Sequence, residues 1–314
     1  MSQRQPILLS LYALSNGEKV MVFGHITHSF IKDLSFTGFS SFKTFFTLFS
    51  LYRTRFVAEQ PIEIIFNTGE VITTTDIKGS FYVTTDLVIG QQNIIDIRVA
   101  GVSVIFLKEL YDLEIHTFHS NTILISDIDD TVIHSYISNS FSKFLTLMFT
   151  AMEKRIAVEP TMKLIHDLCN KGVAPMYLSN SEQNLYPLIS RFLKHNNFPK
   201  GPLFLKEMRK LRDVLLGKKY PIKELHKLTT LNQLIRFFPT NKFILVGDNT
   251  QHDLDIYLRM AEKFPDNIQY IIILKVINRQ ADDEVVAYQT KALQAQGIGL
   301  YYGKEFPTNF ELNE

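Results

Sequence analysis

After residue 120, this 314-residue chain alternates between two kinds of segment, and this feature restricts its fold most. Short apolar runs, typical of buried strands, alternate with longer stretches whose apolar residues recur at helical spacing. Such an alternation predicts a Rossmann-like α/β fold, in which helices cover both faces of a parallel sheet. The predicted strands are TILISD (122–127), VAPMYLS (173–179), KFILVGD (242–248) and IQYIIILKV (268–276).

Helices are predicted between these strands. The stretch EPTMKLIHDLCNKG (159–172) has Pro160 near its start and Gly172 at its end, which is the usual order of helix start and stop signals. The other predicted helices are SKFLTLMFTAMEKR (142–155), SEQNLYPLISRFLKHN (181–196), IKELHKLTTLNQLIRFF (222–238) and DLDIYLRMAEKF (253–264).

Residues 1–118 have a different pattern, in which short apolar alternations are separated by turn sequences such as Asn16-Gly17. We interpret them as a β-rich, sandwich-like N-terminal domain and residues 119–314 as a second domain. The chain length also suggests two domains. One helix is predicted within residues 40–56, where aromatic residues recur at helical spacing. Its aromatic face is interpreted as core, with a membrane-touching face as the alternative.

Composition excludes several classes of protein. Charged residues make up 21% and apolar residues 46%, as in a globular protein rather than a disordered one. The net charge of +1 gives no overall field for nucleic acid, so no nucleic-acid partner is expected. The single cysteine, Cys169, excludes an internal disulfide and a cysteine metal cluster. We see no secretory signal pattern and no transmembrane run, so a cytoplasmic location is expected.

The first predicted strand runs directly into Asp127, Asp129 and Asp130. Carboxylates this close repel one another, so a cation is expected beside them. A carboxylate that a hard metal ion keeps ionised can attack phosphorus. A second carboxyl group can protonate the leaving oxygen and then activate water. Thr131 would hydrogen-bond to the loop or hold Asp127 in place. A solvated acidic turn is the alternative interpretation.

A second polar cluster, Ser179-Asn180-Ser181, ends the next predicted strand and opens a predicted helix. The Ser179 hydroxyl and the free backbone N–H groups of a helix start would suit a phosphate oxygen. An ordinary helix N-cap explains the same residues.

A third polar cluster follows the strand 242–248. Gly247 permits a close turn there, and Asp248 and Asp253 supply acidic oxygens. Because Mg²⁺ prefers about six oxygen ligands, Asp127, Asp248 and the backbone carbonyl of Asp129 form a plausible set, with Asp253 as a further ligand. His252 is interpreted as a bystander. All three clusters follow predicted strands, and ligands bind at the carboxyl ends of parallel strands.

Lysine and arginine outnumber acidic residues between Lys200 and Lys227. Such a stretch is usually a solvated face. One of its lysines, placed near the aspartates, would relieve their repulsion and hold a phosphate group.

Together these motifs resemble the haloacid dehalogenase superfamily of aspartyl-phosphate hydrolases. The sequences ISDIDDTV, MYLSNSEQNLYPLISRFL, FPKGPLFLK, HKLTTLNQLIRFFP and FILVGDNTQHDLDIY further resemble the actin-patch-associated, lipin-related phosphatidate phosphatases, which have little or no cap. This resemblance covers roughly residues 120–280, and weaker similarity extends upstream to VFGHIT and TTDIKGSFYV.

The resemblance implies a role for each motif. Asp127 would be the nucleophile and Asp129 the general acid and base, and Ser179 and Lys227 would complete the catalytic set. The residues that contact substrate would be Thr131, Ser179, Asn180 and Lys227. The catalytic lysine would be Lys227 rather than Lys218, Lys219 or Lys223. Ligands of the Mg²⁺ cofactor would be Asp127, Asp129, Asp248 and Asp253.

The implied reaction is hydrolysis of phosphatidate to diacylglycerol and phosphate. The basic stretch and the aromatic helix would let the protein lie peripherally on an anionic membrane. Two alternatives stay open. One is a phosphatase for another phosphomonoester, such as a phosphoprotein or a nucleic-acid end. The other is a non-catalytic phospholipid-binding or scaffold module.

Overall fold

The computed structural model describes residues 5–28, 55–88, 90, 92–108, 110–128, 131, 159–207, 224–249, 252–276 and 280–306. The helix predicted over 142–155 lies outside these ranges. So does the helix predicted within 40–56, apart from Arg55–Phe56, which form the short strand β3. Asp129 and Asp130 also lie outside them.

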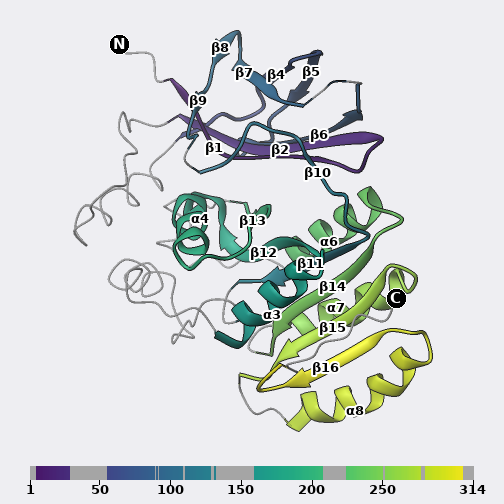
Figure 1. Cartoon of the computed structure of the whole chain (residues 1–314). Helices are drawn as coiled ribbons and strands as arrows, with labels where there is room; N and C mark the ends of the chain where they lie inside the picture. Colours follow the sequence, from purple (N-terminus) through teal and green to yellow (C-terminus); the bar gives the residue numbers. More distant parts are fainter. Residues whose placement is uncertain are drawn as a thin grey trace, which may run out of the picture.

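A six-stranded sheet in the order β13-β12-β11-β14-β15-β16 forms the centre of the α/β part, and all its strands are parallel (Figure 1). The structure thus confirms the predicted parallel sheet, and it adds β13 and β16 to the four predicted strands. The strands are β11 (Thr122–Asp127), β12 (Ala174–Glu182), β13 (Leu203–Lys206), β14 (Lys242–Asp248), β15 (Ile268–Leu274) and β16 (Gly299–Gly303).

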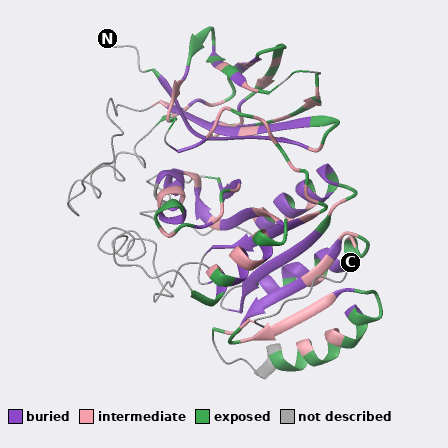
Figure 2. Cartoon of the chain, viewed as in Figure 1, coloured by how far each residue is buried: buried purple, intermediate pink, exposed green. Residues whose placement is uncertain are grey.

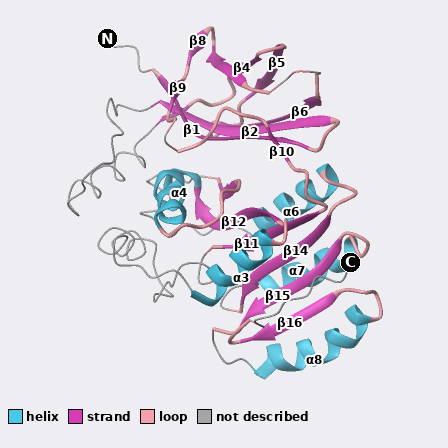
Figure 3. Ribbon diagram, in the orientation of Figure 1, coloured by secondary structure: helices cyan, strands magenta, loops and turns pink. Residues whose placement is uncertain are grey.

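Helices cover both faces of this sheet (Figure 3). Ile123 and Ile125 of β11 pack in one apolar cluster with side chains of α6, α7 and α8, whereas Leu124 belongs to a second cluster that contains side chains of α3 and α4. This alternation follows from the period of two along a strand. The described helices are α3 (Glu159–Asn170), α4 (Tyr186–His195), α6 (Leu225–Phe237), α7 (Asp253–Lys263) and α8 (Gln280–Gln294).

The N-terminal region forms two further sheets. One contains β1 (Pro6–Ser15), β2 (Lys19–His28), β3, β6 (Ser80–Asp86), β9 (Ile105–Phe106) and β10 (His116–Thr117). The other contains β4 (Pro61–Phe66), β5 (Gly69–Thr74), β7 (Ile94–Val99) and β8 (Val102–Ser103). Val22, Ile64 and Ile97 from the two sheets belong to one apolar cluster. The sandwich-like domain and its boundary near residue 118 stay predictions.

The N-terminal sheet that contains β1 and β2 packs directly on the α/β part. Figure 2 shows buried residues along β1 and β2 and along the central parallel strands. The rings of Phe23 and Phe204 stack with their centroids 4.8 Å apart, and Tyr12 meets Tyr186 edge-on at 5.8 Å. Such aromatic contacts bury large apolar areas, so the two parts share a core.

The structure corrects the expected strand and helix boundary at Ser179. Strand β12 does not end there but continues to Glu182, and a short 3₁₀ helix, Gln183–Leu185, precedes α4. Pairing of Glu182 with Lys206 in β13 extends the strand across an irregularity in register. Pro187 lies in the first turn of α4, where proline is favourable.

No described helix is long and apolar enough to cross a bilayer.

Candidate active site

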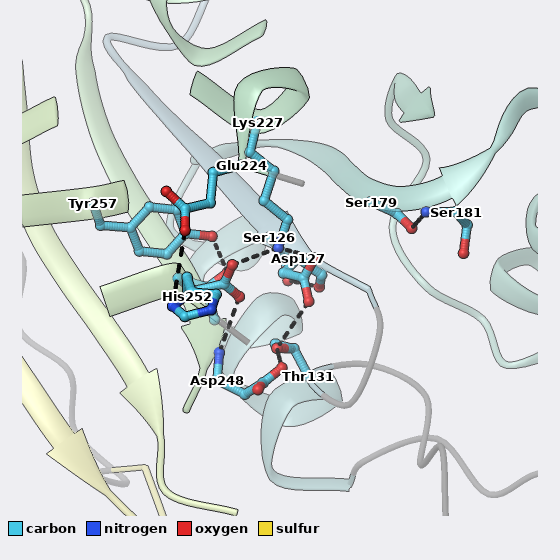
Figure 4. Close-up of polar contacts among 12 residues, drawn as sticks. Ser126, Asp127, Thr131, Ser179, Ser181, Glu224, Lys227, Asp248, His252 and Tyr257 are labelled. Atoms are coloured by element: carbon cyan, nitrogen blue, oxygen red, sulfur yellow. Dashed lines mark hydrogen bonds and ion pairs between the residues drawn. The ribbon is translucent and has the colours of Figure 1, made fainter. Parts of the chain in front are cut away.

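Three buried aspartates converge at the carboxyl edge of the parallel sheet. Asp127 and Asp248 are the last residues of the neighbouring strands β11 and β14, and Asp253 is the first residue of α7. One carboxylate oxygen from each lies within 4.8 Å of the others, and all three side chains are fully buried. Figure 4 shows Asp127 and Asp248 of this group beside Thr131. Adjacent parallel strands end side by side, which explains why residues so distant in sequence meet here.

The ammonium group of Lys227, from α6, lies between two of these carboxylates. Its Nζ is 2.6 Å from Asp127 Oδ1 and 2.5 Å from Asp253 Oδ1. Burial alone would lower the pKa of Lys227, but the two carboxylates raise it by more, so the net shift is upward. Lys227 therefore stays charged.

The hydroxyl of Thr131 connects two of the aspartates. Its Oγ1 donates to Asp248 Oδ2 at 2.8 Å and lies 3.5 Å from Asp127 Oδ2. Because the side chain is fully buried, this contact fixes how the two carboxylates are oriented.

Gly247 leaves room for the carboxylate of Asp253. A Cβ atom at position 247 would lie 2.6 Å from Asp253 Oδ2, closer than real Cβ atoms approach. The same oxygen lies 3.4 Å from the backbone nitrogen of Asp248. The close turn expected from Gly247 is thus a close approach of backbone to a charged side chain.

The aspartate group suits a divalent metal ion. It offers only carboxylate oxygens, the donors that hard cations prefer. Three buried carboxylates facing one buried ammonium would leave an excess of negative charge, and burying uncompensated charge is costly. A divalent cation held by Asp127, Asp248 and Asp253 would balance that excess.

The structure brings together Thr131, Lys227 and the three aspartates of the predicted site. Ser179 lies apart from them in Figure 4, buried in β12, where its Oγ accepts a hydrogen bond from the backbone N–H of Ser181 at 2.9 Å. Asn180 is half-buried beside it. His252 is not part of the aspartate group, and its Nδ1 lies 3.6 Å from Asp255 Oδ2.

Two residues without a predicted role support the carboxyl end of β14. The hydroxyl of Tyr257 donates to the backbone carbonyl of Val246 at 3.0 Å. Asn249 Oδ1 accepts from the backbone N–H of Val276 at 2.9 Å. The position of Asn249 in the polar cluster after β14 could have indicated its role. Tyr257 could not be recognised in this way, because in the sequence it is one more apolar position of a helix.

The fold and the site define a class: an α/β domain with an acidic, lysine-containing site at the carboxyl edge of its parallel sheet. Residues 122–275 match the family model described as Phosphatidate phosphatase APP1, catalytic domain.

The chain is 30% identical over 162 residues to Phosphatidate phosphatase APP1 of Saccharomyces cerevisiae, covering 51% of this chain and 27% of that protein. It is also 30% identical over 156 residues to an uncharacterized protein of Schizosaccharomyces pombe, covering 49% and 25%. The match thus spans about a quarter of each relative. A solved structure, DsGPDH of Dunaliella salina, has 17% identity and a TM-score of 0.35, covering 55% of this chain and 35% of that one. That likeness is too slight to bear on the fold.

Proposed function

We propose that this chain is a Mg²⁺-dependent phosphatase that hydrolyses phosphatidate through an aspartyl-phosphate on Asp127. The observation that carries the proposal is the buried pair of Asp127 and Lys227 at the end of β11. It lies within a segment that matches a phosphatidate phosphatase catalytic domain. The position of Asp127 at the end of an inner strand supports assignment of the α/β part to the haloacid dehalogenase-like class.

In the proposed first step, a carboxylate oxygen of Asp127 attacks phosphorus in line and the bond to the glycerol oxygen breaks. By the superfamily resemblance, Asp129 gives its proton to the departing diacylglycerol. Lys227 is charged and lies beside Asp127, so it would draw the phosphoryl oxygens toward the nucleophile.

In the second step, Asp129 takes a proton from water as the water oxygen bonds to phosphorus. The bond between phosphorus and the Asp127 oxygen breaks, which releases phosphate and restores the carboxylate. A bound Mg²⁺ would supply neutralisation of phosphoryl charge. Thr131 would keep Asp127 and Asp248 in a fixed relative orientation throughout.

Phosphatidate is proposed as substrate because the matched family and the yeast relative both carry that activity in their names. A lipid substrate would require peripheral contact with a membrane, and an anionic cytoplasmic leaflet is the proposed surface. The cytoplasmic location is likewise a proposal.

The test is phosphate release from phosphatidate in mixed micelles with Mg²⁺. We expect release by the wild type, loss of release in Asp127→Asn and after chelation, and retention in Asp255→Asn. Asp255 is a matched control because it is an exposed carboxylate on α7.

Release only from a soluble phosphomonoester such as p-nitrophenyl phosphate, still dependent on Asp127, would keep the mechanism and reject the lipid substrate. Absence of turnover with both substrates would favour a non-catalytic binding module.

A further inference from the structure

A cavity of about 1170 Å³ lies at the edge of the parallel sheet opposite the aspartates. It opens where β12 and β13 begin, and its walls come from β1, residues 108–119, α4 and residues 198–203. We call it the amino-edge cavity. The lining includes Ala174 and Pro175, which pair with Ile123 and Leu124 near the start of β11. It contains none of the three aspartates and not Lys227. The cavity is therefore separate from the candidate active site.

The floor of the amino-edge cavity is apolar. Tyr177, Leu193 and Phe198 line it and are buried. The Tyr177 hydroxyl donates to the backbone carbonyl of Pro199 at 2.6 Å. Because this hydroxyl is already hydrogen-bonded, Tyr177 offers a ligand the carbon atoms of its ring. Such a floor would favour a hydrocarbon chain over a polar solute.

The rim of the cavity is cationic. Lys108, Lys194 and Lys200 line it and are exposed. Lys200 pairs with Asp112, which is the one acidic residue among the described residues of the lining. Lys108 and Lys194 form no ion pair with any residue that the structure describes, so their charges are available to an anion.

The structure of α4 explains only part of this charge. Lys194 lies in the last turn of α4, where a cation offsets the partial negative charge of a helix end. Lys108 and Lys200 come from two other segments and have no such role. Their convergence on one opening is what an anionic group would require.

We propose that the amino-edge cavity binds one molecule of an anionic phospholipid, with an acyl chain on the apolar floor and the headgroup at the cationic rim. The cavity is roomy enough, because ligand sites commonly have volumes of about 300–1,000 Å³. This site does not depend on the proposed catalytic reaction. Its walls come from the N-terminal strands and from the α/β part, so an occupant would also stabilise the contact between them.

The probe is dioctanoyl phosphatidylglycerol below its critical micelle concentration, titrated into the protein by calorimetry. This lipid is a phosphodiester and so is not a substrate of a phosphomonoesterase. We expect saturable binding by the wild type and equal binding by Asp127→Asn. The lipid should also raise the melting temperature of the protein above that of the lipid-free protein. The variant with Lys108→Glu and Lys194→Glu should bind at least about 25-fold more weakly, since loss of each lysine costs about a factor of five and each new glutamate also repels the headgroup.

The matched control carries Lys242→Glu and Lys263→Glu, the same change in charge at exposed lysines outside the cavity. It should bind as the wild type does. Equal weakening in both double variants, loss of binding in Asp127→Asn, or absence of saturable binding would each overturn the proposal.

Three further measurements test the amphiphilic character of the occupant. Dioctanoyl phosphatidylcholine should bind more weakly than the anionic lipid, and inorganic phosphate should not displace the latter. Ala174→Phe, at the start of β12 in the cavity lining, should weaken lipid binding without changing turnover. Displacement by phosphate would instead indicate a plain anion site, and equal binding of both lipids would contradict the role of the rim.

Discussion

Lys227 Nζ lies 2.6 Å from Asp127 Oδ1, and neither side chain has any exposed surface. The same nitrogen pairs with Asp253, so one buried cation compensates two carboxylates from different elements. Removal of either partner leaves an uncompensated buried charge, which is far costlier than loss of a surface ion pair. The site and the stability of the α/β part are therefore coupled.

Lys227→Met should lower the free energy of unfolding by about 3–5 kcal/mol, because it leaves Asp127 and Asp253 buried without their cation. Urea unfolding measures this loss. Lys263→Met is the control, because Lys263 is exposed and its ammonium contacts only Asn232 and the face of the Phe264 ring among the contacts described. It should change stability by less than about 0.5 kcal/mol. Similar losses in the two variants would contradict the coupling.

Thr131→Val removes the hydroxyl that connects Asp127 and Asp248 and keeps the shape of the side chain. We expect affinity for the divalent cation to fall by about 10- to 100-fold, as for other groups that orient metal ligands. The measurement is the Mg²⁺ concentration that gives half-maximal turnover. Thr131→Ser retains the hydroxyl, so its affinity for Mg²⁺ should stay near that of the wild type. An equal loss of affinity in Thr131→Ser would show that packing of the threonine methyl group, rather than its hydroxyl, is responsible.

Gly247→Ala should abolish most turnover, because the new Cβ would force the Asp253 carboxylate away from its position beside Lys227. Tyr257→Phe gives the contrast. It removes one buried hydrogen bond to Val246 at the same strand and should cost about 1–3 kcal/mol of stability while turnover persists. Full activity of Gly247→Ala would show that Asp253 need not hold this position.

His25 should make the protein less stable in acid. Burial lowers the pKa of its imidazole to about 3 from an ordinary value of 6.5, so the unfolded chain takes up a proton that the folded chain refuses. Stability therefore falls as pH drops from about 6.5 toward 3. Urea unfolding measures the free energy of unfolding at each pH across this range. A plot of this free energy against pH should be shallower for His25→Gln than for the wild type. His119→Gln, a change at an exposed histidine, is the control and should keep the pH dependence of the wild type. If His25→Gln also keeps it, His25 is not the cause of the loss of stability in acid.

Elements with strong periodicity were predictable from the sequence. Strands β11, β14 and β15 each contain a run of three or four consecutive apolar residues, and α7 carries an apolar face that ends near Lys263. Strand β13 was not predictable, because its four residues gain their structure only by pairing with β12. The polar helix α8 likewise lacks a wide apolar face.

The candidate site was predictable where a side chain follows a strand directly. Asp127 and Asp248 end neighbouring parallel strands, so their sequence positions alone imply proximity. The contact of Lys227 with both Asp127 and Asp253 depends on how α6 packs against the sheet, which no local pattern specifies. The surroundings of Ser179 depend on pairing of β12 with β13 beyond that residue, so the expected helix start was wrong.

Identification of the phosphorylated residue tests the central proposal most directly. The protein would be mixed with phosphatidate and Mg²⁺, quenched in acid within a single turnover, digested and analysed by mass spectrometry. The account predicts one phosphoryl group on Asp127, absent from Asp127→Asn and gone after longer incubation. Phosphate release that proceeds with no phosphoryl group on Asp127, or with one on a different residue, would contradict it.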